Sequence, residues 1–354
     1  MLRIVTMAVG LSVCCGVPAQ TPAGKTSAHQ KVTFLNKNPL AGFNAELRSA
    51  RSMCAEDGAT IYVQTSDQPD FAQITRVSDS GSVSTRALHA PIDAGGVKVL
   101  DWFVGKQEIV LLIKTWDRSD DASVQHNLRY LLYTMESRGG GEPNIVSLDV
   151  KFSPRSAAVF GGGELLLTGK DEANDLPVLT LVKRDGTVDR FYDLSTIRGS
   201  VSTRPRTLFT GRFIPYGDDL LLANSGGDAQ VLVLRVNGDG RVITLHAPQG
   251  FAITRILNSG DSGVVAVQVR PSDYAKSEED TGHIVEYNTP SGRMMRWLDL
   301  DGVKSEDVTC AVNQSITAIT PDPEFKPVES SLKDGSSGSS PQEQVPMVVL
   351  TSKH

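Results

Sequence analysis

Four arginines are the residues of this sequence whose type and position best suit ligand binding. Each lies in a segment that leads into a predicted innermost strand of a repeated sheet: Arg155, Arg204, Arg206 and Arg255. A guanidinium group carries a planar fork of N–H donors that matches both oxygens of a carboxylate or a phosphate. If the innermost strands surround one axis, these arginines bind an acidic group there. The alternative is that they are solvated loop charges or form ion pairs between neighbouring sheets.

Two histidines are further candidates for ligand contact. His126 and His283 each lie where a predicted loop between the second and third strands of a sheet rejoins a strand. His89 and His246 instead occupy the same place in a repeated Leu-His-Ala-Pro sequence, at residues 88–91 and 245–248. This equivalence favours a structural role for His89 and His246.

Local signatures of catalysis are absent from the sequence. It contains no Gly-x-Ser-x-Gly elbow and no His-Glu-x-x-His pair. A binding protein is therefore favoured over an enzyme. A metal site that takes one ligand from each repeat would leave no local signature, however. The alternative is thus a hydrolase or lactonase with calcium or another divalent ion at the mouth of the axis.

The elements that would position these residues recur about every 50 residues. In four copies a Gly-containing turn joins two short strands, at residues 74–88, 179–194, 232–248 and 284–300. Six apolar runs are second strands, and they start near Ile61, Ile109, Leu165, Leu220, Val264 and Ile316. A repeat of this length that is built only from short strands is typical of a β-propeller. The six runs predict an all-β chain with six four-stranded blades.

The last repeat lacks a fourth strand of its own. Residues 346–352 form a predicted third strand with no partner after it, and residues 31–36 form a predicted strand without a sheet. Pairing these two would complete the sixth blade with an N-terminal strand and leave few exposed strand edges. The alternative is two separate β-sandwiches.

This organisation resembles the broad class of six-bladed β-propellers in its architecture alone. The repeats carry no Trp-Asp dipeptide that recurs from blade to blade, no Tyr-Trp-Thr-Asp repeat and no kelch-type double glycine in register; Trp116-Asp117 occurs once. The Ser-Pro-Asp motif of lactonase-like propellers is also absent, and residues 153–155 (Ser-Pro-Arg) come nearest to it. Functional residues of a particular family therefore cannot be carried over to this chain.

The N-terminus is typical of an export signal. Arg3 precedes an apolar stretch at residues 4–17, and Val17-Pro18-Ala19 fits a cleavage site after Ala19. The predicted organisation is a signal peptide at 1–19, a flexible leader at 20–30 and a propeller at 31–354 with a Ser/Gly-rich loop at 330–344. The protein would be secreted or periplasmic. A lipoprotein anchored through Cys14 is the lesser alternative.

Two cysteines remain after removal of the signal, and they are predicted to lie on neighbouring innermost strands. Cys54 precedes Ile61 by seven residues, and Cys310 precedes Ile316 by six. In an exported chain this placement favours a disulfide between Cys54 and Cys310. The alternative is two buried thiols.

Charge and loop lengths indicate the class of partner. The net charge of −6 argues against a nucleic-acid binder, and no segment after the signal could span a bilayer. The longest predicted connections share one face, at residues 116–127, 195–207, 270–282 and 321–344. Because long loops on a rigid scaffold commonly carry binding residues, we expect this long-loop face to bind a protein, a peptide or a glycan.

Overall fold

A computed structural model describes most of the predicted propeller. The described residues are 29–34, 51–65, 70–78, 82–91, 94–117, 126–138, 140–194, 211–224, 227–257, 263–273, 282–298, 300, 304–312, 315–321 and 347–353. The predicted signal peptide, most of the leader and the Ser/Gly-rich loop lie outside these ranges. So do Arg204, Arg206 and most of the four long connections.

Five four-stranded sheets are each formed by strands that are consecutive in the chain. The first sheet contains β2 (Ser52–Cys54), β3 (Thr60–Thr65), β4 (Asp70–Val77) and β5 (Val83–His89). The second contains β6 (Gly96–Val104), β7 (Glu108–Asp117), β8 (His126–Glu136) and β9 (Asn144–Ser147). The third contains β10 (Ser153–Val159), β11 (Leu165–Asp171), β12 (Leu176–Val182) and β13 (Val188–Phe191).

The fourth and fifth sheets repeat this order. The fourth contains β14 (Arg212–Tyr216), β15 (Asp219–Asn224), β16 (Ala229–Leu234) and β17 (Gly240–Leu245). The fifth contains β18 (Phe251–Ile256), β19 (Val264–Pro271), β20 (His283–Asn288) and β21 (Arg293–Leu298). Neighbouring strands in all five sheets are antiparallel.

A sixth sheet joins the two ends of the chain. It has the order β1 (His29–Phe34), β24 (Met347–Lys353), β23 (Ser315–Pro321) and β22 (Val308–Val312). The 3₁₀ helix η4 (Ser305–Asp307) precedes β22. The pairing of β1 with β24 agrees with the N-terminal strand predicted from the sequence, although β1 begins two residues earlier than the predicted 31–36.

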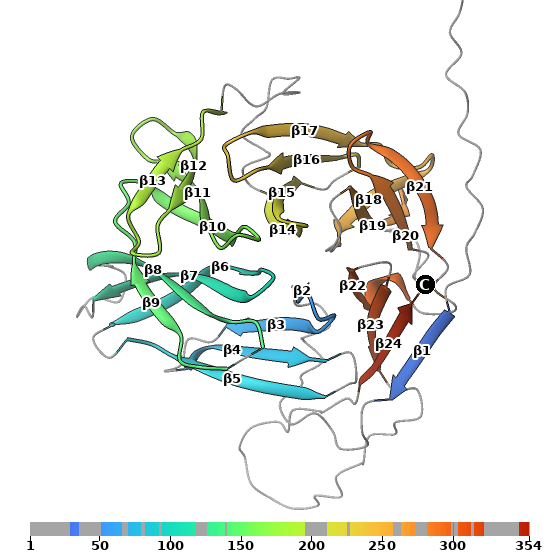
Figure 1. Cartoon of the computed structure of the whole chain (residues 1–354), viewed down its shortest axis with the longest axis horizontal. Coiled ribbons are helices and arrows are strands. Elements are labelled where there is room, and N and C mark those ends of the chain that lie inside the picture. The colour runs from blue at the N-terminus through green and yellow to red at the C-terminus, as the bar shows by residue number, and fades with distance from the viewer. Residues whose placement is uncertain are drawn as a thin grey trace, which may run out of the picture.

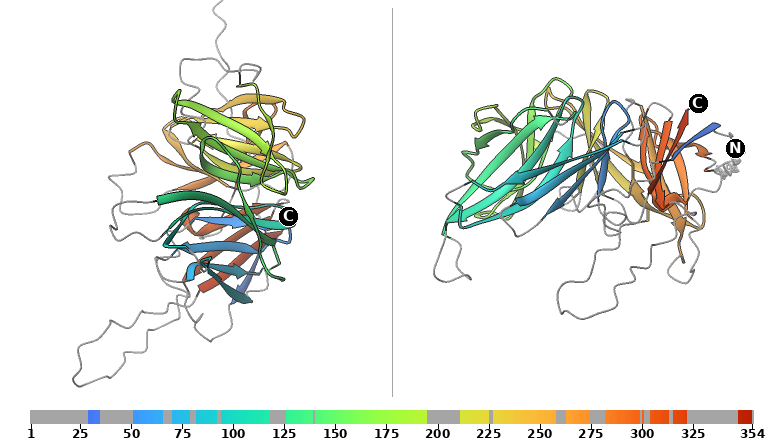
Figure 2. Two further views of the ribbon diagram at one scale, coloured as in Figure 1. Left: turned by 90° about the vertical axis from the view of Figure 1, so that its left-hand side faces the viewer. Right: turned by 90° about the horizontal axis from the view of Figure 1, so that it is seen from below.

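The sheets are arranged around an axis as a β-propeller (Figure 1). The innermost strand of each of the five sheets is its first in the chain: β2, β6, β10, β14 and β18. In the sixth sheet the innermost strand is β22. The side views show that the strands run between the two faces of the ring (Figure 2). The short turns between first and second strands therefore lie at one face, and the first strands begin at the other.

The second strands form most of the core because each sheet packs between two neighbours. Val110, Leu111 and Leu112 of β7 are 0% exposed, and so are Leu166 and Leu167 of β11. A strand that is covered on both faces needs an unbroken apolar run, which explains why these segments stand out in the sequence. Burial of each such side chain stabilises the fold by about 1.5–3 kcal/mol.

One glycine shows how closely the outer parts of neighbouring sheets approach. Gly186, in the turn between β12 and β13, has φ +87°, and a Cβ there would collide with the carbonyl oxygen of Ser147 at the end of β9. Asp149 and Thr187 form a parallel bridge beside this contact. The turn therefore holds the third sheet against the second, and only glycine fits this position.

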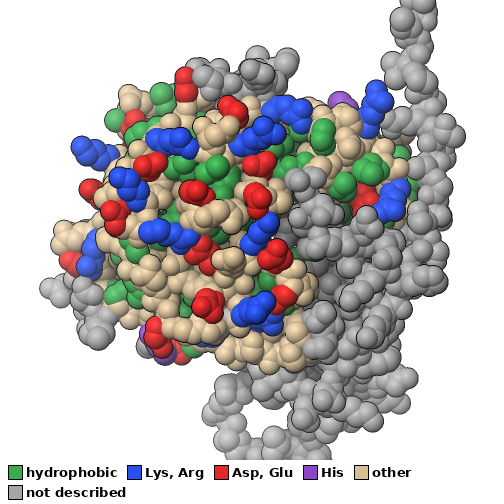
Figure 3. Space-filling model, viewed as in Figure 1, with side chains coloured by type: hydrophobic (Ala, Val, Ile, Leu, Met, Phe, Trp, Pro, Cys, Tyr) green, Lys and Arg blue, Asp and Glu red, His purple; other side chains and the backbone are tan. Residues whose placement is uncertain are grey.

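The described surface carries no large region of one charge on the face seen in Figure 3. Basic and acidic side chains are interspersed over the sheets on that face. This mixture agrees with the modest net charge of the chain.

Candidate ligand-binding site at the propeller axis

Polar side chains cluster on the innermost strands. In β6, β10 and β18 the pairing with the second strand shifts by one residue, and the residue after each shift is Asp101, Ser156 or Arg255. Such bulges re-aim a side chain and often lie beside functional sites. Arg212 is the first residue of β14, and Arg51 directly precedes β2. Arg212 and Arg255 therefore lie on innermost strands, and Arg51 lies just before one.

Arg51 links the first and second sheets. Its guanidinium donates a hydrogen bond to Asp101 Oδ1 and lies 4.8 Å from the ring centroid of Trp102, so it forms an ion pair and a cation–π contact. The side chain of Asp101 is 8% exposed and that of Arg51 is 16% exposed. Burial lowers the pKa of Arg51, and the carboxylate of Asp101 opposes this shift.

Arg212 brings a second positive charge towards this pair. Its charge also lowers the pKa of Arg51, which indicates that the two guanidinium groups lie close enough to repel each other. β2 and β14 belong to the first and fourth sheets, so the repulsion acts between strands that are not neighbours. Arg212 is exposed and forms no ion pair with any residue in the described ranges.

Arg255 reaches from the fifth sheet to the sixth. Its guanidinium donates a hydrogen bond to the carbonyl oxygen of Val308 in β22. The Nε–H group of Arg255 is buried and has no hydrogen-bond partner within the described part of the chain. Burial lowers the pKa of Arg255, Tyr62 opposes the shift, and Arg270 adds to it.

Tyr62 and Asp307 lie next to Arg255. Burial raises the pKa of the Tyr62 hydroxyl, while the charge of Arg255 lowers it and that of Asp307 raises it further. Asp307 is 4% exposed and directly precedes β22. Gln268 of β19 donates a hydrogen bond to Ser305 Oγ of η4 at 2.9 Å. Polar contacts therefore bind the fifth sheet to the segment that enters the sixth.

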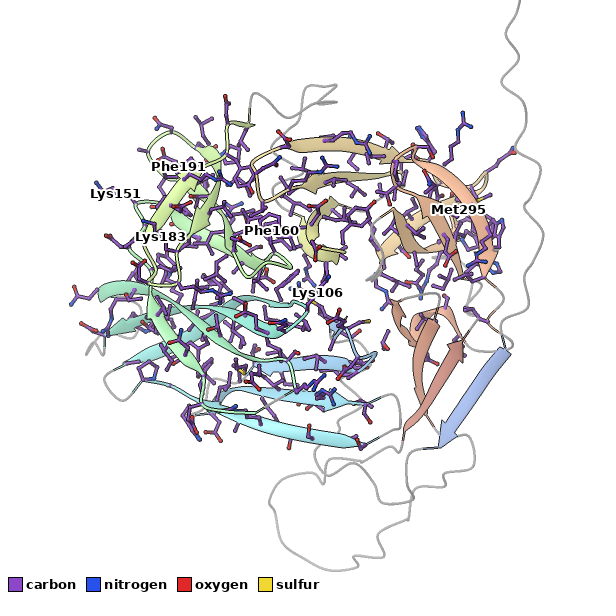
Figure 4. All side chains as sticks on the ribbon, viewed as in Figure 1. Lys106, Lys151, Phe160, Lys183, Phe191 and Met295 are labelled. Carbon is purple, nitrogen blue, oxygen red and sulfur yellow. The ribbon has the colours of Figure 1, made fainter. Side chains whose placement is uncertain are left out.

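At the opposite end of the axis, short turns of neighbouring sheets contact one another. Lys106, in the turn after β6, forms a 2.7 Å ion pair with Asp218, in the turn after β14. The amide of Gly161 donates to the carbonyl oxygen of Asp218 at 3.1 Å. Figure 4 shows Lys106 and Phe160 towards the centre of the ring, with Phe191 and Met295 at its outer edge. Three sheets thus meet at this end.

The structure does not bring all the predicted arginines together. Arg155 is the extra residue of the β10 bulge and is exposed, and no ion pair joins it to another described residue. Arg255 is half-buried and lies within the innermost strand β18, near its end, whereas the sequence predicted it in the segment that leads into that strand. Arg204 and Arg206 lie outside the described ranges, so their place at the axis stays a prediction.

The two predicted histidines begin the third strands of their sheets. His126 begins β8, but its side chain is not among those described. His283 begins β20, is exposed, and packs edge-on against Phe251 at 5.7 Å and Trp297 at 5.4 Å between centroids. These three rings form a small aromatic cluster on the fifth sheet. A role for either histidine in ligand contact stays a prediction.

The repeated histidines have equivalent contacts. His89 Nδ1 lies 2.5 Å from Asp70 Oδ1, and His246 Nδ1 lies 2.9 Å from Asp228 Oδ2. In both cases the histidine ends the fourth strand of its sheet and the aspartate lies at the start of the third. The recurring contact agrees with the structural role that the repeated tetrapeptide predicts.

Three other predictions concern metals, membranes and cysteines. Across the described ranges, no three His, Cys, Asp or Glu side chains are grouped so that they could hold a metal ion, and the calcium alternative stays a prediction. The same part of the chain has no helix whose length and apolar character would let it cross a membrane. Cys54 lies on β2 and Cys310 on β22, but the side chain of Cys310 is not described.

Sequence reasoning missed Arg51, Asp101 and Arg212. The sequence does contain a signal: each is a charged residue within or just before an innermost strand. Such a residue is unusual in a segment that neighbouring sheets cover. Second strands and outer turns recur regularly in the sequence, whereas bulges shift the numbering of the innermost strands.

No protein family matches the sequence, and no curated protein matches it either. Among solved structures, the chain is similar to Trypanosoma rangeli sialidase in complex with sialic acid, with 11% identity and a TM-score of 0.41 over 93% of this chain. The chain spans 59% of the length of that sialidase.

The phage phi92 endosialidase shows 9% identity and a TM-score of 0.46, over 92% of this chain and 69% of the other. A functionally unknown protein from Desulfotomaculum acetoxidans shows 13% identity and a TM-score of 0.35, over 70% and 68%. At such similarity nothing follows about activity. The fold assignment rests on the sheets themselves.

Proposed function

We propose that this protein is an exported six-bladed β-propeller that binds a protein, peptide or glycan at the long-loop end of its axis. The observation that carries the proposal is the difference between the two ends. Turns of the second, third and fourth sheets bond to one another at the short-turn end, through Lys106, Gly161 and Asp218. At the other end, the first strands begin with Arg51 and Arg212, whose charges repel.

The six-bladed count extends what the five sheets of consecutive strands establish. It treats the sheet of β1, β24, β23 and β22 as the blade that closes the ring, with residues 31–354 forming one domain. The pairing of His29–Phe34 with Met347–Lys353 supports this count. Deletion of residues 20–36 would then lower the melting temperature of the whole domain. An unchanged melting temperature would contradict closure by β1.

A disulfide between Cys54 and Cys310 would fasten this closure. In support, Cys54 Sγ lies 3.5 Å from the carbonyl oxygen of Thr309, the neighbour of Cys310. Thr60 and Thr309 also share a 3.0 Å hydrogen bond between hydroxyls. Mass spectrometry of non-reduced tryptic peptides would show one linked pair. Two alkylated thiols in native protein would contradict the disulfide.

Export is tested separately from binding. Expression of the full chain with its own N-terminus should give a processed protein outside the cytoplasm that begins at Gln20. N-terminal sequencing distinguishes this from lipidation at Cys14. An unprocessed cytoplasmic protein would contradict the proposed export.

The binding function is tested with purified residues 20–354 on arrays of glycans and peptides. A ligand is expected whose binding is lost when Arg212 is replaced by Glu, and kept when Arg241 is replaced by Glu. Arg241 is the matched control because it is an exposed arginine of the same sheet, but on the outermost strand β17. Absence of any ligand, or equal loss with both variants, would contradict binding at the axis.

A further inference from the structure

We propose that the ligand is a glycan and that one of its pyranose rings stacks on the aromatic cluster of Phe251, His283 and Trp297. The inference rests on the proposed function, because it selects the glycan from the three classes of ligand named there. It is carried by the position of the three rings on the fifth sheet, by their contacts with one another and by their exposure.

The first step concerns position. Phe251 begins β18, His283 begins β20, and Trp297 is the last residue but one of β21. In each of the five sheets, the first and third strands begin at the long-loop face and the fourth strand ends there. The three rings come from different strands, yet all of them lie at the face that the proposed function assigns to binding.

The second step concerns what supports the rings. Val285 pairs with Trp297, so their two side chains share one face of the fifth sheet. Val285 is 0% exposed and belongs to an apolar cluster of side chains from the fourth and fifth sheets, against which Phe251 and Trp297 also pack. This core holds the two rings in place. An aromatic surface that is already fixed loses little conformational entropy when a ligand binds.

The third step concerns the shape of the surface. The ring centroid of Trp297 lies 5.3 Å from that of Phe251 and 5.4 Å from that of His283. At these distances the rings contact one another edge to face, so a ligand does not fit between them. His283 is exposed, and Phe251 and Trp297 are half-buried. A ligand would therefore lie over the outer surface of the cluster.

The fourth step concerns the chemistry of such a ligand. The face of an aromatic ring is negative and attracts weakly positive groups. A pyranose ring presents C–H groups of this polarity across its face, while its hydroxyl groups point outward to water or to polar neighbours such as an imidazole. A peptide is instead bound along a groove or a strand edge over several residues. A compact surface of three contacting rings therefore favours a sugar over a peptide.

The experiment titrates residues 20–354 with cellotetraose and with hexaproline in isothermal titration calorimetry. Cellotetraose is the glycan probe because the ring hydroxyl groups of β-glucose are equatorial, so both faces of each ring present C–H groups. Hexaproline represents peptides that bind to aromatic side chains. We expect cellotetraose to bind more tightly than hexaproline. Equal or tighter binding of hexaproline, or binding of neither probe, would overturn the inference.

Variants of Trp297 then assign the aromatic cluster. Trp297→Leu keeps an apolar side chain but removes the ring, and is expected to weaken cellotetraose binding about five- to tenfold. Trp297→Phe keeps a ring and should weaken binding less. Phe191→Leu is the matched control and should leave the affinity unchanged, because Phe191 is also an aromatic residue of an outermost strand, β13, and is 62% exposed. A Trp297→Leu protein with native near-ultraviolet circular dichroism and unchanged affinity would overturn the assignment.

Two further measurements do not depend on the packing of Trp297 against the core. His283→Ala removes an exposed ring, and is expected to weaken cellotetraose binding at least about twofold. Cellotetraose should also change the tryptophan fluorescence of the unmodified protein, and the change should be lost in Trp297→Phe. An equal fluorescence change in both proteins would place the sugar elsewhere and overturn the assignment.

The inference and the proposed function fail in different ways. An array ligand whose binding depends on Arg212 but not on Trp297 would overturn the role of the aromatic cluster and leave the proposed function intact. A peptide as the preferred array ligand would likewise overturn only the choice of a glycan. No ligand of any class on the arrays would instead contradict the proposed function itself.

Discussion

Arg51 and Arg255 are the same residue type at the innermost strands of two sheets, yet their surroundings differ. Arg51 meets the carboxylate of Asp101 and the face of Trp102. Arg255 donates to a backbone carbonyl, keeps a buried Nε–H without a described partner and forms no ion pair with a carboxylate in the described ranges. Burial lowers the pKa of both. Both arginines therefore link neighbouring sheets, the first through an ion pair and the second through a neutral acceptor.

This difference shows two ways in which a buried charge is compensated in one repeated architecture. A paired charge near the axis holds two sheets together, because the attraction to its partner offsets the free energy of desolvation. A charge that lacks a carboxylate partner does not contribute in this way, because only hydrogen bonds to neutral groups offset its desolvation. Four predictions test the contrast, and the largest loss of stability is expected at Asp101 and the smallest at Asp218.

Replacing Asp101 with Asn is expected to have the largest effect on the free energy of unfolding. The change leaves the guanidinium of Arg51 without its counter-charge, and we expect a loss of about 2–3 kcal/mol in the free energy of unfolding. Urea denaturation measures this loss. Ser156→Ala is the control, since Ser156 follows the equivalent bulge in β10, and should change stability by less than about 0.5 kcal/mol. Equal effects of the two variants would show that Arg51 and Asp101 do not link the sheets.

Two tyrosine hydroxyls outside the innermost strands are expected to make stability fall at alkaline pH. Tyr192 donates to the carbonyl oxygen of Arg235 at 2.9 Å, and Tyr287 to that of His246 at 2.6 Å. Burial raises the pKa of both hydroxyls to about 12. An unfolded tyrosine titrates near pH 10, so stability is complete below about pH 10 and falls as the pH rises towards 12.

Urea denaturation at several pH values measures this fall. Tyr287→Phe should cost about 1 kcal/mol at pH 8 and make the decline above about pH 10 shallower. Arg241→Gln serves as a control that leaves the profile unchanged. A Tyr287→Phe profile parallel to that of the unmodified protein would show that this hydroxyl does not titrate with unfolding.

Replacing each arginine with Met compares them directly. Arg51→Met leaves the carboxylate of Asp101 buried alone, and we expect it to cost about 2 kcal/mol. Arg255→Met removes a buried guanidinium that has no carboxylate partner among the described residues, and should change stability by less than about 1 kcal/mol in either direction. Thermal unfolding in the absence of ligand measures both. A greater loss of stability for Arg255→Met than for Arg51→Met would contradict this difference between the two arginines.

The smallest effect is expected at the short-turn end. Asp218→Asn removes the ion pair with Lys106, but the side chain of Asp218 is 80% exposed. An exposed pair of this kind contributes less than about 0.5 kcal/mol. The backbone contact from Gly161 remains in the variant. A loss of more than about 1 kcal/mol in urea denaturation would mean that the side chains, and not the backbone contact, hold this end together.

Much of the fold could be predicted from the sequence, because its signals are local. Unbroken apolar runs at Ile61, Ile109 and Leu165 predicted second strands, and β3, β7 and β11 contain them. The Gly-containing turn near Gly186 predicted an outer hairpin, which β12 and β13 form. The pairing of β1 with β24 followed from the one strand that lacked a partner at each end of the chain.

The candidate site was determined by tertiary structure. Arg51 and Asp101 are 50 residues apart, and Arg255 and Val308 are 53 apart. Which side chains meet depends on bulges that offset the register of the innermost strands, and on the approach of strands from separate sheets. Strand periodicity is encoded within a few residues, so the sequence alone determined the repeated sheets and their order. An ion pair near the axis forms only when all the sheets are in place, so the tertiary structure alone determined which arginine is paired with a carboxylate and which is not.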